Sequence, residues 1–489
     1  MDARPDLPPP ALTHDEILSI ILGVMLAMLL AALDQTIVAT ALPTIGRDLN
    51  DVEHLSWIVT AYLLASTAVT PLYGKLSDIH GRRVTLLAGV AIFVVGSIAC
   101  ALAPTMLTLI LARGLQGLGG GGLISLAQTI IADIVSPRER ARYQVYIASV
   151  FVTASLAGPV LGGFFAEHLH WSVIFWINLP LGLVAFAMTY ANLRRLPRHE
   201  RPHRLDVLGA VLLTSATVAL MLALTWGGMR YPWGSAPILG LLAASILLSA
   251  AFAYRLLHAA EPLIPLTVLA NPVVRAGTLA ACFGMGTFIG LTIYVPLYFE
   301  AVRGISASQT GLALIPLMVG TVIGATASGR AMARVRHYRR LPVVGLVVSV
   351  AATLLLGFEA NGLPFGVLEV TLAAISIGLG TLLPVTTVSI QNAVAPHQLG
   401  TATATMNFFR QVGGAVLVAA FGAIVIGGAG AGRPGLTLEN LAGAGGDAAL
   451  AGTFRWVFLA AAAGLAAALL FLLTMEERPL RGAAAIENS

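Results

Sequence analysis

Residues 74–83 read Gly-Lys-Leu-Ser-Asp-Ile-His-Gly-Arg-Arg and lie between two hydrophobic stretches that are each long enough to cross a bilayer. Glycines let two helix ends approach closely, and Asp78 at the end of one helix can pair with Arg82 or Arg83 at the start of the next. Gly74, Asp78, Gly81, Arg82 and Arg83 are therefore predicted to latch one conformation. The alternative is an ordinary anchor loop, which needs only the basic residues.

The composition indicates an integral membrane protein. Hydrophobic residues make up 57% of the 489 residues, charged residues only 10%, and the mean hydropathy is +0.87. The apolar runs exceed the roughly 20 residues that a helix needs to span hydrocarbon, and strands of alternating polarity are absent from the pattern. The predicted fold class is all-α and membrane-integral. The net charge of +5 indicates topology rather than nucleic-acid binding.

Hydrophobic runs between polar breaks predict about fourteen transmembrane helices. They cover residues 17–45, 55–74, 84–103, 106–132, 142–166, 172–193, 207–227, 236–258, 274–300, 308–331, 341–358, 365–390, 399–428 and 452–474. A faint repeat relates 57–74 to 310–329, each followed by a basic segment. It predicts two pseudo-symmetric six-helix halves, 1–193 and 274–489, joined by residues 194–273 with a connector and two inserted helices.

The basic residues predict the orientation of the chain. With a cytoplasmic N-terminus, 21 of the 28 Lys and Arg residues fall on the inner side, 5 on the outer side and 2 within spans. Both termini are therefore expected in the cytoplasm. The first span is too long for a removable signal peptide, and it lacks a small-residue cleavage site.

Two charged residues lie within predicted spans of the first half. A carboxylate such as Asp34 in the membrane costs at least a few kcal/mol unless it is protonated or paired. At 1.5 Å per residue, Asp34 lies about 18 Å and Arg113 about 12 Å from the outer ends of their helices. A contact between them would suit proton coupling, because alternating exposure could change the protonation of the carboxylate. A static buried ion pair is the alternative.

Several stretches resemble the major facilitator superfamily. Residues 74–83 resemble its signature loop, Gly-x-x-x-Asp-x-x-Gly-Arg-(Arg/Lys). Residues 33–43, Leu-Asp-Gln-Thr-Ile-Val-Ala-Thr-Ala-Leu-Pro, and 171–182, Trp-Ser-Val-Ile-Phe-Trp-Ile-Asn-Leu-Pro-Leu-Gly, are similar to its fourteen-span drug:proton antiporter branch. So are 113–120, Arg-Gly-Leu-Gln-Gly-Leu-Gly-Gly, and 158–163, Gly-Pro-Val-Leu-Gly-Gly.

The resemblance implies roles for particular residues. It implies that the helices of Asp34 and Arg113 line a central cavity and that Arg113 serves proton transfer. Gly158, Pro159, Gly162 and Gly163 match the antiporter motif, where small residues and proline make a bendable helix face. Close packing alone is the alternative for this motif.

Three further residues are candidates for substrate binding or coupling: Gln116, Glu300 and Arg410. Glu300 could attract cations in an outer vestibule, or it could be an ordinary interfacial carboxylate. Arg410 could act directly in transport, or it could extend to the interface or bond helix carbonyls. The histidines and the two cysteines, Cys100 and Cys282, form no predicted metal site, and no cofactor is expected.

The resulting functional hypothesis is proton-coupled export of amphiphilic or cationic drugs by alternating access. The alternatives are export of a lipid, siderophore or other endogenous metabolite, and a membrane sensor or scaffold that does not transport. The sequence lacks the Gly-x-x-x-x-Gly-Lys-(Ser/Thr) motif of ATPases and the signatures of an intramembrane enzyme. Expected partners are a small-molecule substrate, protons, membrane lipid and a periplasmic adaptor, with no nucleic acid. The expected location is the cell inner membrane.

Overall fold

The computed structural model describes residues 13–195, 205–335, 337–430 and 448–480. In these residues the chain is helical, apart from short connections and one isolated bridge between Gly227 and Tyr231. Fourteen helical segments within the described part are long and apolar enough to cross a membrane. The chain is therefore an all-α, multi-pass membrane protein. Because the number of spans in the described part is even, the start of the first span and the end of the last span lie on the same side of the membrane.

The first six spans form one bundle. They comprise the following helices: α1 (His14–Asp48), α2 (Leu55–His80), α3 (Arg82–Ala101), α4 (Met106–Gly120) with α5 (Leu123–Ile134), α6 (Pro137–His168), and α7 (Val173–Trp176) with α8 (Asn178–Asn192). A short 3₁₀ turn, Leu193–Arg195, follows.

The last six spans form the second bundle. They comprise these helices: α12 (Pro272–Ala301), α13 (Ala307–Ala313) with α14 (Ile315–Arg334), α15 (Arg340–Glu359), α16 (Phe365–Ala393), α17 (Leu399–Gly430) and α19 (Ala448–Thr474). A 3₁₀ turn, Pro396–Gln398, precedes α17. The two inserted helices are α9 (Val207–Trp226) and α10 (Ala236–His258), followed by the short helix α11 (Leu266–Ala270).

The helix ends follow from local sequence. Thr13 caps α1, and Ser136 caps α6 with Pro137 at its first turn; each cap has a glutamate three residues later, and these glutamates complete capping boxes. The predicted span 106–132 is broken at Gly121 and Gly122, where a Cβ atom would lie 2.3 Å from the carbonyl oxygen of Ser66 and 2.2 Å from the ring of Tyr73. The break therefore lets α2 approach the chain between α4 and α5.

The signature stretch, residues 74–83, is helical on both sides of Gly81. Asp78 lies near the end of α2 and Arg82 begins α3, as predicted, but α2 continues to His80, beyond the predicted span end at residue 74. Gly81 alone connects them, with φ of +87°, a conformation that glycine adopts without strain. The charged residues of this stretch are therefore on helices, which fixes the directions of their side chains.

Most of the hydrophobic core is divided in the same way as the helices, and one small cluster joins Ala132 of α5 to residues of α12, α16 and α17. One cluster of buried residues lies between 273 and 475, and two others lie between 20 and 193. The division agrees with two halves of six spans, while the domain boundaries at 193 and 273 stay a prediction.

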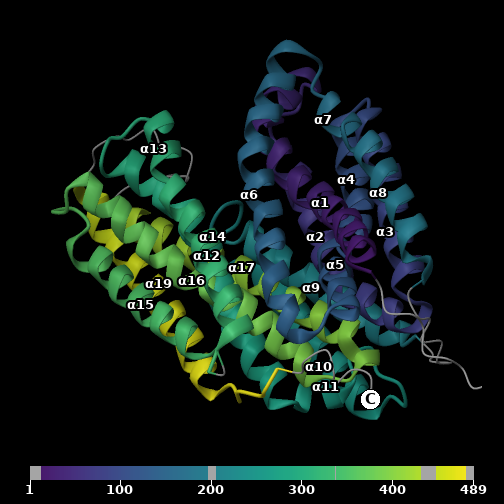
Figure 1. Ribbon diagram of the computed structural model, residues 1–489. Coiled ribbons are helices and arrows are strands. Elements are labelled where there is room, and N and C mark those ends of the chain that lie inside the picture. Colours follow the sequence, from purple (N-terminus) through teal and green to yellow (C-terminus); the bar gives the residue numbers. More distant parts are fainter. Residues whose placement is uncertain (1–12, 196–204, 336, 431–447, 481–489) are drawn as a thin grey trace, which may run out of the picture.

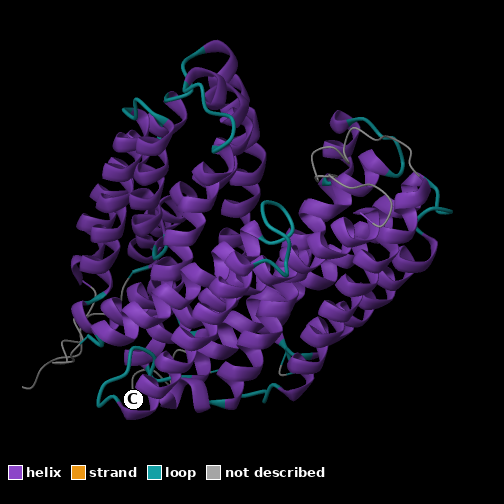
Figure 2. Ribbon diagram, turned by 180° about the vertical axis from the view of Figure 1, so that it is seen from behind, coloured by secondary structure: helices purple, strands orange, loops and turns teal. Residues whose placement is uncertain are grey.

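The two bundles lie side by side and diverge towards one face of the molecule (Figure 1). The splayed side carries α7 and α13, and the closed side carries the end of α2 and the start of α17. Figure 2 shows the same shape from behind, with the loop between α9 and α10 between the bundles. Helix α9 contacts both α2 and α17, so the inserted pair covers part of the seam between the halves.

Candidate functional site

The two charged residues predicted within the first bundle are in contact. Arg113 Nη1 donates to Asp34 Oδ2 over 2.5 Å, and the two side chains are 1% and 0% exposed. Gln116 Nε2 donates to Asp34 Oδ1 over 2.7 Å, and Asn178 Nδ2 donates to the same oxygen over 3.2 Å. Asp34 therefore accepts from three side chains on two other spans, as an ionised carboxylate requires when it is buried.

The guanidinium of Arg113 is enclosed by further partners. Its Nε donates to the carbonyl of Ile58 over 3.0 Å, and its Nη1 donates to Gln116 Oε1 over 2.5 Å. Its Cζ lies 4.4 Å from the centroid of the Tyr62 ring, which adds a cation–π contact. The pair is closed to solvent in this conformation, so a proton can reach Asp34 only after the surrounding helices move.

Close helix packing brings the amide of Gln116 to the carboxylate. A Cβ atom at Gly96 of α3 would lie 2.5 Å from the Cα of Gln116, so only glycine permits this approach of α3 and α4. Gln116 Nε2 then also donates to Ser97 Oγ over 2.8 Å. Gln116, predicted as a substrate or coupling residue, is thus part of the Asp34 network.

The glycines of the predicted antiporter motif pack against α1 close to Asp34. A Cβ atom at Gly158 would lie 2.0 Å from Thr36 Oγ1, and one at Gly162 would lie 2.3 Å from the carbonyl oxygen of Ile37. Thr36 Oγ1 also donates to the carbonyl of Ala154 over 2.8 Å. Helix α6 in turn packs against α14 of the second half, so α1 is connected through α6 to the other bundle.

The remaining two residues of that motif do not share this contact. Pro159 is exposed, and a Cβ atom at Gly163 would meet no other atom within 4 Å. The close approach of α6 to α1 therefore depends on Gly158 and Gly162.

Asp78 connects the two halves on the closed side. Its carboxylate accepts from the backbone N–H of Gly400 over 3.0 Å, from the N–H of Thr401 over 2.8 Å and from the Thr401 hydroxyl over 2.6 Å. These groups form the start of α17, where free N–H groups and the helix dipole favour an anion. Arg82 also donates to Asp78.

The two predicted arginine partners of Asp78 have different positions. Arg82 pairs with Asp78, donates to Asp133 over 2.8 Å and lies 3.5 Å from the carbonyl oxygen of Pro396. The guanidinium of Arg83 instead lies over the Tyr190 ring, 4.5 Å from its centroid. Arg82 is therefore the one of the two that contributes to the contact between halves.

Gly74 allows α2 and α17 to touch. A Cβ atom there would lie 2.5 Å from the Cβ of Ala404 and 2.7 Å from the carbonyl oxygen of Gly400. Towards the membrane centre, Thr67 Oγ1 donates to Gln411 Oε1 over 2.8 Å. The contact between the two helices thus runs from the closed side to the middle of the membrane, where it consists of neutral hydrogen bonds.

Arg410 and Glu300 lie in the second half and contact neither Asp34 and its partners nor Asp78 and its partners. Arg410 is 9% exposed and donates to Thr387 Oγ1 over 3.0 Å and to Thr386 Oγ1 over 3.3 Å. Glu300 is half-buried in the last turn of α12 on the splayed side. The structure thus separates the predicted substrate and coupling residues into different places.

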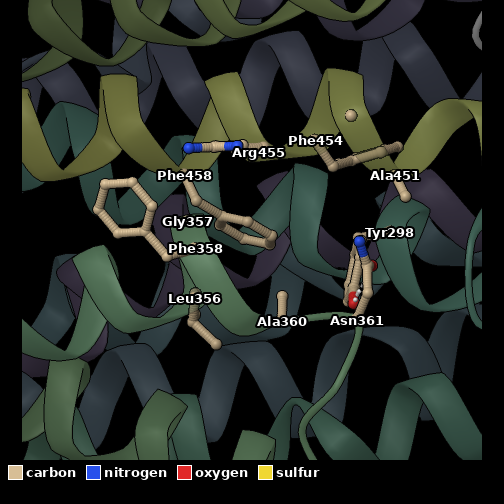
Figure 3. Close-up of a pocket in the computed structure, with 11 residues that line it drawn as sticks. Tyr298, Leu356, Gly357, Phe358, Ala360, Asn361, Ala451, Phe454, Arg455 and Phe458 are labelled. Atoms are coloured by element: carbon tan, nitrogen blue, oxygen red, sulfur yellow. Dashed lines mark hydrogen bonds between the residues drawn. The ribbon is translucent and has the colours of Figure 1, made fainter.

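A pocket of about 190 Å³ lies in the second half between α12, α15 and α19 (Figure 3). Tyr298 donates to Asn361 Oδ1 over 3.1 Å at one end, and the Arg455 guanidinium lies 5.1 Å from the centroid of the Phe358 ring at the other. Phe454 and Phe458 also line it. None of the residues predicted for coupling or gating lines this pocket.

Several residues of these networks were missed by sequence analysis. Asn178 and Ser97 contact the Asp34 network, Asp133 contacts Arg82, and Thr401 contacts Asp78. Asn178 was detectable as a polar residue within the hydrophobic, branch-specific stretch 171–182. The others are short polar residues at helix ends or interiors, where their type alone indicates no partner.

The structure thus has two helical bundles that meet along one seam, with a buried charged pair in the first bundle. A sequence profile of the Major Facilitator Superfamily matches residues 24–418. The chain belongs to the major facilitator superfamily, whose members are transporters and not enzymes.

Among its relatives is the multidrug transporter protein MdtP of Bacillus subtilis (strain 168). It is 32% identical over 406 residues, which cover 83% of this chain and 75% of that protein. Multidrug resistance protein 3 of the same organism is 33% identical over 405 residues, covering 83% and 79%. An uncharacterised transporter from Mycobacterium tuberculosis (strain CDC 1551 / Oshkosh) is 35% identical over 404 residues, or 83% of this chain. The match spans only 59% of that relative.

Solved structures show the same fold. The proton:xylose symporter XylE, bound to 6-bromo-6-deoxy-D-glucose, matches with a TM-score of 0.64 at 14% identity, over 96% of this chain and 99% of that one. The human organic anion transporter MFSD10 matches with a TM-score of 0.63 at 19% identity, over 94% and 100%. At these identities the likeness concerns the fold alone.

Proposed function

We propose that this protein exports small amphiphilic compounds, cationic drugs among them, in exchange for protons, by alternating access of its two halves. The observation that carries the proposal is the buried pair of Asp34 and Arg113. A carboxylate and a guanidinium are costly inside a membrane, so their presence there calls for a functional reason. The relatives named multidrug transporter and multidrug resistance protein support drugs as the substrate class.

The pair can couple proton binding to helix movement. While Asp34 is ionised, Arg113, Gln116 and Asn178 hold it at the junction of their helices. Protonation removes the charge to which Arg113 donates and weakens these hydrogen bonds. The change reaches the other half through α1 and α6, because Gly158 packs on Thr36 two residues from Asp34.

The gating residues belong to the same proposal. Asp78 and Arg82 hold the closed side, and release of their contacts with α17 would open it. In the proposed topology both termini and the closed side are cytoplasmic, and the bilayer is the cell inner membrane, so the conformation described is outward-facing. A periplasmic adaptor is a proposed partner, and membrane lipid surrounds the spans.

The experiment that tests this function uses the purified protein in sealed liposomes with a pH-sensitive dye inside. Addition of an exported drug such as ethidium should move protons in the direction opposite to the drug, and liposomes without protein should show no response. Drug movement without proton movement would contradict antiport. A growth-inhibition panel of dyes, biocides and antibiotics in an efflux-deficient host separates drug export from the alternative, export of a lipid, siderophore or other endogenous metabolite.

A further inference from the structure

Arg410 is a buried guanidinium whose hydrogen-bond partners among the described residues are all neutral. It donates to the hydroxyls of Thr387 and Thr386 over 3.0 and 3.3 Å and to Asn407 Oδ1 over 3.4 Å. Its Nε has no hydrogen-bond partner among the described residues, although the side chain is only 9% exposed. Two of these three hydrogen bonds are long, so the neutral oxygens compensate the buried charge poorly.

Other buried or half-buried arginines in the described part are compensated differently. Arg113 donates to Asp34, and Arg82 donates to Asp78 and Asp133. Arg140 lies near the closed end of α6 and donates to backbone carbonyls there. Arg410 is eleven residues into α17, about 16 Å from its start, so it lies near the middle of the membrane. A charge at that depth without an opposite charge is costly, and a ligand that supplies the opposite charge would be bound favourably.

The guanidinium lies beside the seam that must open during alternating access. Asn407, which accepts from Arg410, donates across the seam to Gln128 Oε1 over 2.8 Å. Gln411, the next residue, bonds to Thr67 and Thr70 of α2. Separation of the halves on the closed side breaks both contacts. Asn407 and Arg410 are then free to face a compound that enters from that side.

The acidic side chains of the described spans give the complementary observation. Asp34 is the acidic residue buried in the membrane interior, and Arg113 already neutralises it. Glu300 and Glu369 lie within one or two turns of the helix ends on the splayed side. The interior near the seam therefore offers an unneutralised cation and lacks a free anion in the described part, which favours an anionic ligand group.

We propose that Arg410, with Thr386, Thr387 and Asn407, binds the anionic group of an amphiphilic substrate. The group is a carboxylate, sulfonate or phosphate, which the planar guanidinium can bind with two parallel hydrogen bonds. The inference rests on the proposed export function and narrows its substrate class: an amphiphile that also carries an anionic group is bound more tightly than the same compound without that group.

The test compares two dyes that differ in one charge. Rhodamine B carries a free carboxylate, and its ethyl ester has the same fluorophore without it. Dissociation constants would be measured by fluorescence anisotropy with the protein in phosphatidylcholine nanodiscs. The parent should bind rhodamine B at least about tenfold more tightly than the ester, the effect expected of one charge-assisted hydrogen bond. Arg410→Gln should abolish this preference and leave the affinity for the ester unchanged.

Control variants separate the anion site from a structural role. Arg455→Gln removes an exposed arginine of the same half and should keep the preference. Thr387→Val removes one hydroxyl of the site but keeps the charge, so it should weaken the preference without abolishing it, which tests the site even if Arg410→Gln does not fold. The melting temperature of Arg410→Gln without dye should equal or exceed that of the parent, whereas a purely structural role of Arg410 would lower it.

The remaining outcomes overturn the inference. An equal preference in the parent and Arg410→Gln, a preference for the ester, or no binding of either dye would do so. Nanodiscs of phosphatidylglycerol distinguish a substrate group from a lipid phosphate. If the parent binds rhodamine B more weakly in them than in phosphatidylcholine nanodiscs, and Arg410→Gln shows no such difference, the site binds lipid instead. Because these measurements use no proton gradient, their failure is distinguishable from a failure of proton coupling.

Discussion

The substitution Asp78→Asn should shift the protein towards a conformation that is open on the side that is closed in this structure. The amide keeps one acceptor oxygen, but its NH₂ group cannot accept from the N–H and hydroxyl of Thr401, so two charge-assisted hydrogen bonds are lost. Since water can replace part of this interaction, the closed side should be weakened by about 1–3 kcal/mol. That free energy corresponds to a change in the population ratio of about 5-fold to 150-fold.

Spin-label distances measure this shift directly. In a background with Cys100 and Cys282 replaced by alanine, labels at His80 and Arg275 report the closed side, and labels at Leu169 and Leu312 report the splayed side. All four side chains are exposed, and each pair spans the two halves. In Asp78→Asn, a longer distance between the labels at His80 and Arg275 should gain population. The distance between the labels at Leu169 and Leu312 should shorten.

Asp133→Asn is the matched control. Asp133 pairs with Arg82 of its own half, and among the described residues it forms no hydrogen bond to α17, so its substitution should shift the populations less. Unchanged distance distributions in Asp78→Asn, together with a normal turnover rate, would refute the latch and leave residues 74–83 as a topological anchor.

Three further substitutions test other parts of the account. Arg113→Gln should slow drug-dependent proton movement, because Asp34 loses its charge-assisted hydrogen bond from the guanidinium; an active variant with the parent's rate would remove Arg113 from coupling. Gly158→Val should lower the free energy of unfolding by about 1–3 kcal/mol and slow transport through overpacking of α1 and α6, whereas Gly163→Ala, with open space around it, should be tolerated; equal denaturation midpoints would contradict this. Gly74→Leu should separate α2 from α17 and shift spin-label distances in the same direction as Asp78→Asn, and a parent-like distribution would show that the close approach is dispensable.

Much of the fold was predictable because it depends on hydrophobicity alone. Each of the fourteen predicted runs overlaps a helix long enough to span a membrane. The boundaries were less accurate, since α2 continues through charged residues to His80 and α1 extends from His14 to Asp48. A helix continues beyond its apolar run wherever its backbone can go on forming hydrogen bonds, and hydropathy does not indicate where that is.

The candidate site was predictable only where a residue carries a high cost. Asp34 and Arg113 are conspicuous because charges are expensive in a membrane, and they lie in contact. The bonds of Asp78 to Gly400 and Thr401 join residues more than 300 positions apart, and local sequence does not indicate which helix start faces the carboxylate. Neutral hydrogen bonds such as that from Thr67 to Gln411 were equally unpredictable, since either side chain could instead bond to the backbone of its own helix.

The most direct test of the central claim is substrate-dependent proton movement in liposomes that contain Asp34→Asn. The asparagine keeps the shape and the hydrogen bond from Arg113 but cannot carry a proton. The variant is predicted to fold, to bind drug and to exchange drug across the membrane, while proton movement falls to the level of liposomes without protein. Drug-dependent proton movement at the parent's rate in Asp34→Asn would contradict the assignment of Asp34 as the coupling carboxylate.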